Sequence, residues 1–205
     1  MECFLDSILP SIAYPYPLEL TNKQKNCIEE LSLAISKTGI EVKINEPFPT
    51  PKELVVAVDV EHDESGGFVG CGLYCGTGVV YYYSSLISLN SVDFHALRII
   101  AHNGVSDVEI LNEWGIRVSY DQLVWDTMLI SHVIDSSQKD YSLKGLAKRE
   151  LAISYPSYDD IVGKRGLKAE RITLDKQPLE LVSLYNAMDC IVTWKLYERQ
   201  KKSYE

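Results

Sequence analysis

LVVAVDVE, at residues 54–61, consists of an apolar run followed directly by two acids that are separated by one residue. The run Val55 to Val58 suits a strand that is covered on both faces, and it is too short for a helix of ordinary length. Side chains two residues apart in a strand point the same way, so Asp59 and Glu61 are expected to project from one face. The stretch therefore predicts a buried strand whose end carries an acid pair.

This acid pair has two interpretations. Two carboxylates so close together repel, so a folded protein either keeps one of them protonated or supplies a cation. Divalent ions that prefer oxygen ligands are the obvious cation. The alternative is a strand that ends in a solvated turn, which residues 62–67 would continue. The choice between the two depends on the rest of the chain.

The composition is that of a soluble globular protein. The chain has 205 residues, of which 46% are hydrophobic and 24% charged, enough for one domain of ordinary size and a smaller segment. No segment reaches the length of a membrane span, and the first twenty residues carry acids but no Lys or Arg. That excludes an ordinary signal peptide and argues against an organelle transit peptide. The five cysteines form no C-x-x-C pair, so we expect reduced thiols, no zinc site, and a location in the cytoplasm or another reducing compartment, without secretion.

The charge is unevenly distributed. A net charge of −9 argues at first against a nucleic-acid partner, because phosphate binding usually needs a basic surface. However, residues 1–64 hold twelve acids and five bases, whereas residues 144–176 hold eight bases and five acids. The total charge therefore does not exclude a polyanionic substrate.

The first fifty residues are predicted to be an N-terminal extension with one short helix and a Pro-rich linker. Thr21 and Gln24 resemble a capping box, and an apolar stripe at helical spacing ends before Gly39. Prolines at 47, 49 and 51 then indicate a linker into a main domain at 51–205.

The main domain is predicted to be α/β, a mixed sheet flanked by helices. After the opening strand, we expect two strands that a tight turn at 76–77 joins, at 67–75 and 78–84. A further buried strand is expected at 98–104. Helices are expected at 93–97, 107–114, 124–134, where Asp126 is a candidate cap, 143–151 and 179–200. The tract 154–178 is polar, basic and poor in core signals, and the last helix is expected to bury one face.

Two further acids are distinctive by position. Asp107 follows a buried strand, in the kind of crevice where α/β sheets bind ligands, although an Asp in a first helical turn is also explained by the helix dipole. Asp189 lies inside the last helix between apolar neighbours, where an unpaired charge is costly. Tyr185 stands one turn before it, so its hydroxyl and the Asp189 carboxylate can reach one point. The alternative for Tyr185 is a packing residue.

Together these segments form a pattern. The motifs DVE at 59–61, HNGVSD at 102–107 and YNAMD at 185–189 occur in the order and spacing of the three exonuclease motifs of the DEDD superfamily. The chain resembles its Tyr-containing branch, and in particular the 3′–5′ proofreading exonuclease domain of family A DNA polymerases, over residues 54–200. Leu184 stands where the other branch has its histidine. The strings FVGCGLYC, ILNEWGI, WDTMLISHVI and YSLKGLAKREL are similar to the same family.

The resemblance implies a ribonuclease H-like fold and metal-dependent removal of nucleotides from a 3′ end. Two divalent cations, Mg or Mn, would be held by the matching acids Asp59, Glu61, Asp107 and Asp189, with Asp59 shared between the ions. Tyr185 and Glu61 would orient the attacking water. Two metals about 3.5–4 Å apart can generate the nucleophile on one side of a phosphodiester and stabilise the leaving oxygen on the other.

Substrate contacts are expected outside the acids. The resemblance implies that Asn103 touches the terminal nucleotide. His62 follows the acid pair and would face the substrate, unless it is a solvated turn histidine. We expect a basic loop over the single strand, with a solvated loop as the alternative; its residues are Lys164, Arg165, Lys168 and Arg171.

The predicted activity is hydrolysis of single-stranded DNA 3′ ends to nucleoside monophosphates, in proofreading or DNA processing. An RNA-trimming enzyme similar to RNase D and a catalytically inert nucleic-acid-binding module are the alternatives. A DNA polymerase is the expected partner, in cis or in trans, and no membrane is expected. Two interpretations of the whole chain are open: it is either a free-standing exonuclease whose Met1 is a natural start, or part of a larger polymerase.

Overall fold

The computed structural model describes residues 20–49, 54–163 and 172–204. All four predicted basic-loop residues lie outside these ranges. Among the helices that are described, none combines the length and the apolar character that crossing a membrane requires.

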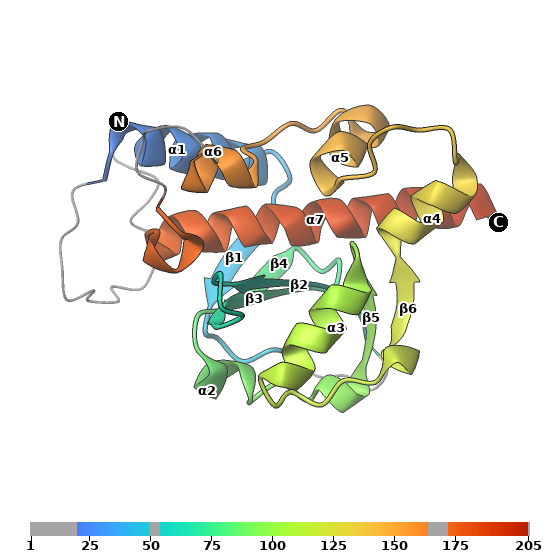
Figure 1. Cartoon of the computed structure of the whole chain (residues 1–205), viewed down its shortest axis with the longest axis horizontal. Coiled ribbons are helices and arrows are strands. Elements are labelled where there is room, and N and C mark those ends of the chain that lie inside the picture. The colour runs from blue at the N-terminus through green and yellow to red at the C-terminus, as the bar shows by residue number, and fades with distance from the viewer. Residues whose placement is uncertain (1–19, 50–53, 164–171, 205) are drawn as a thin grey trace.

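A six-stranded mixed sheet forms the centre of the molecule, which confirms the predicted α/β class (Figure 1). Its strand order is β1-β4-β3-β2-β5-β6. β2 pairs antiparallel with β3 and parallel with β5, so the stretch that contains the acid pair lies inside the sheet. The strands are β1 Glu41–Ile44, β2 Leu54–His62, β3 Phe68–Tyr74, β4 Val79–Tyr83, β5 Leu97–Ala101 and β6 Leu123–Asp126.

Helices cover the sheet in unequal layers (Figure 1). The long helix α7 crosses one face, and α1, α5 and α6 lie beyond it, whereas α3 lies on the opposite face. The helices are α1 Asn22–Ser36, α2 Leu86–Leu89, α3 Gly104–Glu113, α4 Thr127–Ile134, α5 Leu143–Leu151, α6 Tyr158–Val162 and α7 Leu179–Tyr204. Because each face of the sheet has its own covering, the described residues form two hydrophobic cores.

The alternation of side chains along β2 directs the acid pair. Val56 and Val58 belong to the core on the α3 side, whereas Ala57 belongs to the core on the α7 side. Since side chains two apart share a face, Asp59 and Glu61 follow Ala57 and face α7.

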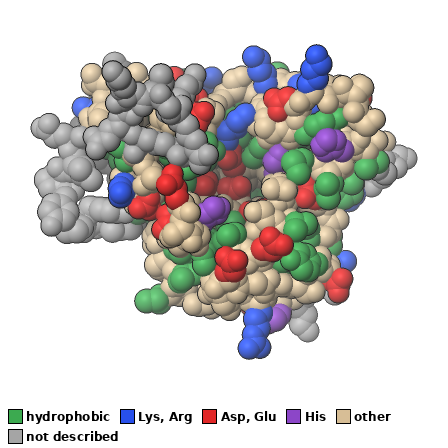
Figure 2. Space-filling model, in the orientation of Figure 1, with side chains coloured by type: hydrophobic (Ala, Val, Ile, Leu, Met, Phe, Trp, Pro, Cys, Tyr) green, Lys and Arg blue, Asp and Glu red, His purple; other side chains and the backbone are tan. Residues whose placement is uncertain are grey.

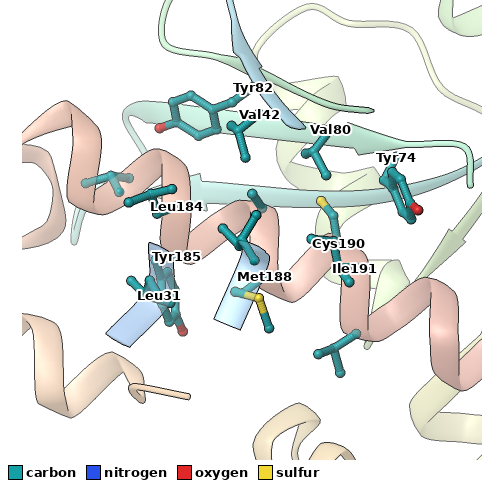
Figure 3. Packing of buried hydrophobic residues seen from close by; sticks show 14 of the residues in the cluster. Leu31, Val42, Tyr74, Val80, Tyr82, Leu184, Tyr185, Met188, Cys190 and Ile191 are labelled. Carbon is teal, nitrogen blue, oxygen red and sulfur yellow. The ribbon is translucent and has the colours of Figure 1, made fainter. Parts of the chain in front are cut away.

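α7 is more deeply buried than its sequence predicts. A single buried face was expected, but residues 181–193 are all buried, including Ser183, Asn186 and Asp189. The reason is the additional layer: α7 packs against the strands on one side and against α1 and α5 on the other. Figure 3 shows Leu184, Met188 and Ile191 of α7 in this core, together with side chains of the strands and Leu31 of α1.

Three other expectations are wrong in detail. Residues 123–126 form the edge strand β6 and not the start of a helix. β1 was not anticipated, yet it pairs with β4 and joins the sheet. The tract at 154–178 contributes Ile161, Val162 and Leu174 to the core, although its sequence is poor in core signals. The hairpin of β3 and β4, the capping box of α1 and helix α5 are confirmed. The division of the chain at residue 51 stays a prediction.

Candidate functional site

Three of the predicted acids converge where β2 faces α7. Asp59 and Glu61 of β2 and Asp189 of α7 each offer a carboxylate oxygen, and these oxygens lie within 4.8 Å of one another. Figure 2 shows acidic side chains on the floor of a hollow near the centre of the visible face, with a Lys or Arg side chain above them. Residues 130 positions apart in the chain thus form one cluster, which we call the acid cluster.

Two glycines of β3 leave space beside this part of β2. Gly72 is the cross-strand partner of Asp59, and Gly70 is the partner of Glu61. A Cβ atom on Gly72 would lie 1.9 Å from Oδ1 of Asn186, and one on Gly70 would lie 2.0 Å from the hydroxyl of Tyr82. The space that the missing side chains leave is therefore filled by groups from α7 and β4.

Asn186 fixes the Asp59 carboxylate. Its Nδ2 donates to the Asp59 backbone oxygen at 3.1 Å and to Asp59 Oδ2 at 2.8 Å. Asn186 is fully buried, so this contact ties α7 to β2 beside the acid cluster. The spacing of residues along the chain does not indicate this contact, because Asn186 and Asp59 are 127 positions apart.

The acid cluster is electrostatically unfavourable without a cation. Removal from water raises the pKa of Asp59 well above its ordinary value, and the charges of Glu61, Asp189 and Asp107 raise it further. The pKa of Glu61 rises to about 8, first because of burial and then because of Asp189. Carboxylates in this state gain stability when a cation binds, so the donor set fits one or more hard divalent ions.

Asp107 lies in the first turn of α3, at the side of the acid cluster. Burial raises its pKa to about 8, while a hydrogen bond from the backbone of Val60 acts in the opposite direction. Its charge acts on Asp59 and Glu61, although it does not belong to the group of oxygens within 4.8 Å. α3 begins at Gly104, three residues before the expected start, so Asp107 does not open the helix.

Tyr185 is buried and adjoins the acid cluster from α7. Burial raises the pKa of its hydroxyl well above the ordinary value, and a hydrogen bond to Asp189 contributes to the increase. The hydroxyl group therefore stays protonated near neutral pH and can donate a hydrogen bond.

Besides Asn186, two further residues at this site were not among the predicted ones. Lys144 of α5 forms an ion pair with Asp189. The hydroxyl of Tyr155 donates to the same oxygen, Asp189 Oδ1, at 2.5 Å. Lys144 lies on the same face of the helix as Ala147 and Leu151, so its position in the sequence indicates a side chain that faces the core. For Tyr155 we find no comparable signal.

The remaining predicted contacts lie around the acid cluster. His62 is exposed at the end of β2, and its Nδ1 lies 2.8 Å from the backbone oxygen of Asp63. Asn103 is exposed, immediately before α3, in a left-handed conformation with φ 64°. Both are accessible to a ligand, and their contact with substrate stays a prediction.

Asp126 joins the beginnings of two helices. Its carboxylate accepts from the backbone N–H groups of Asn103 and Gly104 at 3.2 and 2.8 Å, and from those of Met128 and Leu129 at 2.9 and 3.2 Å. Asp126 therefore caps α4, as predicted, and also holds the segment that carries Asn103 into α3.

Replacing Asp126 by Ala is expected to lower the free energy of unfolding by about 3 kcal/mol, because four backbone N–H groups, that of Gly104 buried and the others partly buried, lose their acceptor. For a chain of this size the melting temperature would fall by about 10 °C. Thr21→Ala is the matched control, since Thr21 caps only α1 through one bond to the backbone of Gln24, and about 1 kcal/mol is expected there. Thermal unfolding followed by circular dichroism measures both. Equal losses in the two variants would contradict the bridging role.

Comparisons with known sequences agree with this geometry. A sequence model of the family described as 3′–5′ exonuclease matches residues 37–204. The DNA polymerase of Bacillus phage SP01 is 36% identical over 105 residues, which cover 50% of this chain and 11% of that protein. DNA polymerase I of Chloroflexus aurantiacus is 36% identical over 107 residues, or 51% of this chain and 10% of that protein. This chain thus spans about a tenth of the length of these relatives.

Solved structures show a similar fold. The structure of Brucella melitensis NrnC bound to pGG has a TM-score of 0.57 and 16% identity, and the match covers 80% of this chain and 81% of that one. The EXO domain of Aedes aegypti Nibbler has a TM-score of 0.51 and 12% identity, over 86% of this chain and 87% of that one. At such identities the likeness concerns the fold alone.

Proposed function

Because this chain belongs to the 3′–5′ exonuclease family, and is therefore a nuclease with a ribonuclease H-like α/β fold, we propose that it hydrolyses single-stranded DNA from the 3′ end. The products would be nucleoside monophosphates and a strand that is shorter by one residue at each step. The observation that carries the proposal is the convergence of Asp59, Glu61 and Asp189 from two elements.

Asp59, Glu61, Asp107 and Asp189 are the residues that would hold two divalent ions. Four carboxylates carry about −4 and two divalent ions +4, so the loaded site would be close to neutral. Bound divalent ions would supply an activated water and would stabilise the leaving 3′ oxygen. This neutralisation also explains how a protein with a net charge of −9 accepts a polyanion at its acid cluster.

The side chains of this site then have separate tasks. Tyr185, protonated and beside Asp189, is placed to donate a hydrogen bond to the attacking water or to a phosphate oxygen. Glu61 is the acid nearest in sequence to Asp59 on the same face of β2, and we assign it to the orientation of that water. Asn186 keeps Asp59 in place through the 2.8 Å bond to its carboxylate. These assignments use residues whose side chains are buried in the fold, which favours precise alignment.

The proposal of DNA as substrate is supported by the relatives, which are named DNA polymerases. RNA 3′ ends are the second candidate, because phosphodiester hydrolysis by bound divalent ions does not itself distinguish deoxyribose from ribose. A polymerase that acts with this exonuclease, in the same chain or in another, is the proposed partner.

The test compares matched DNA and RNA single strands, labelled at the 5′ end, with Mg²⁺, with Mn²⁺ and with a chelator. We expect a ladder that shortens from the 3′ end, on DNA faster than on RNA, and no products with the chelator. Faster degradation of RNA would reverse the substrate assignment. Full activity in the presence of the chelator would overturn the metal-dependent mechanism.

A further inference from the structure

A cation of the protein itself is already bound to the acid cluster. The ammonium group of Lys144 forms an ion pair with Asp189 Oδ1, the oxygen that also accepts from Tyr155. The charge of Lys144 also lowers the pKa of Asp59 and of Glu61 against the dominant effect of burial. Lys144 therefore acts on all three members of the cluster.

Two aromatic rings hold Lys144 in this position. Its Nζ lies 4.0 Å from the centre of the Tyr155 ring and 4.3 Å from that of the Tyr185 ring. Cations are attracted to the faces of aromatic rings, and more strongly where water is excluded. The ion pair is thus part of a formed site and differs from a pair of flexible surface side chains, which contributes little.

A divalent ion held by Asp59, Glu61 and Asp189 would lie close to this ammonium group, because both would use the Asp189 carboxylate. A lysine ammonium and a divalent ion that share one carboxylate oxygen repel each other, so they cannot both bind it favourably. The Lys144 side chain is 24% exposed, whereas that of Asp189 is 8% exposed. Its flexible four-carbon stem can therefore carry the charge outward while Asp189 stays in place.

We propose that Lys144 is an internal counter-ion which competes with divalent cations for Asp189 and is displaced when they bind. This inference rests on the proposed metal site and deepens it. The competition lowers metal affinity and keeps the acid cluster compensated when no metal is bound.

The first experiment measures Mn²⁺ binding by calorimetry, without nucleic acid. Lys144→Met is expected to bind Mn²⁺ about five- to tenfold more tightly than the wild type, because both the competitor and its charge are lost. Lys144→Arg keeps the charge and should bind as the wild type does. Lys148→Met, an exposed lysine on the same helix, is the matched control and should also be unchanged. A purely structural role of Lys144 predicts the opposite sign, since a disturbed site binds metal more weakly.

The second experiment uses the wild-type protein and so does not depend on a variant that folds. Reductive methylation of lysines, read by mass spectrometry, is compared with and without Mg²⁺. Modification of Lys144 should increase several-fold when Mg²⁺ is added, while that of Lys148 should not change.

The outcomes separate the two proposals. Absence of Mn²⁺ binding in the wild type would overturn the metal site itself. Binding in the wild type with equal or weaker affinity in Lys144→Met, or equal reactivity of Lys144 with and without Mg²⁺, would overturn the competition alone.

Discussion

Replacing Asp59 by Asn is expected to reduce the rate of 3′ nucleotide release by on the order of a thousandfold or more, which corresponds to about 4 kcal/mol of lost transition-state stabilisation. Asp59 would be the ligand shared by both ions, so one substitution weakens both. Asn has nearly the same shape, and its amide oxygen can still accept the hydrogen bond from Asn186 that Asp59 accepts at 2.8 Å. The expected loss is therefore chemical and does not come from unfolding.

Stability distinguishes this explanation from damage to the fold. Burial and neighbouring carboxylates raise the pKa of Asp59, so its charge disfavours the folded state without metal, and its removal should raise the melting temperature of the metal-free protein by a few degrees. Asp121→Asn, at an exposed position after α3, is the matched control and should change neither quantity. Initial rates on labelled single-stranded DNA with Mg²⁺ and thermal unfolding with a chelator give the two measurements. A variant that retains more than a tenth of the wild-type rate would contradict the assignment of Asp59.

The position of Asp59 was predictable because it depends on local regularities. The period of two along a strand sets Asp59 and Glu61 on one face, and the apolar run before them identifies the strand. The period of a helix likewise sets Tyr185 and Asp189 one turn apart. Such features do not depend on what the rest of the chain does, and they are the ones that the structure reproduces.

The features that sequence analysis missed depend on tertiary packing. Strand β6 has four residues directly before a helix, and such a short run has no period that separates a strand from a first helical turn. α7 carries polar residues all round, so its sequence does not show that α1 and α5 cover the side opposite the sheet. The roles of Lys144, Tyr155 and Asn186 arise from contacts with partners 34 to 127 positions away. The helical spacing of Lys144 indicates a core-facing position, but it does not identify Asp189 as the partner.

The glycines of β3 also depend on tertiary packing. The sequence around them indicates a strand, but it does not show which side chains fill the space that the glycines leave. Replacing Gly72 by Ala is expected to lower the free energy of unfolding by about 3 kcal/mol, or the melting temperature by about 10 °C, because the new Cβ overlaps buried neighbours. It would lie 1.9 Å from Asn186 Oδ1 and 2.7 Å from Cys190 Sγ. Exonuclease activity should also fall, because Asn186 would have to give up its hydrogen bond to Asp59 in order to move away from the new methyl group.

Gly145→Ala is the matched control for Gly72→Ala, because its new Cβ would meet a carboxylate oxygen of Asp140 at 2.2 Å. Asp140 is exposed and can move away at the cost of its hydrogen bond from the backbone of Ser142, so a loss well below that of Gly72→Ala is expected. Thermal unfolding of both variants, together with initial rates on single-stranded DNA, makes the comparison.

A double substitution tests whether Asn186 is the cause. Asn186→Ala removes the atom closest to the new methyl group, so the pair Gly72→Ala and Asn186→Ala should recover about half of the stability that Gly72→Ala loses, a coupling that only residues in contact show. Activity should not recover with it, because Asp59 then lacks its hydrogen-bond donor. Losses that simply add in the double variant would mean that Asn186 does not fill the space at Gly72, whereas restored activity would mean that Asp59 needs no support from α7.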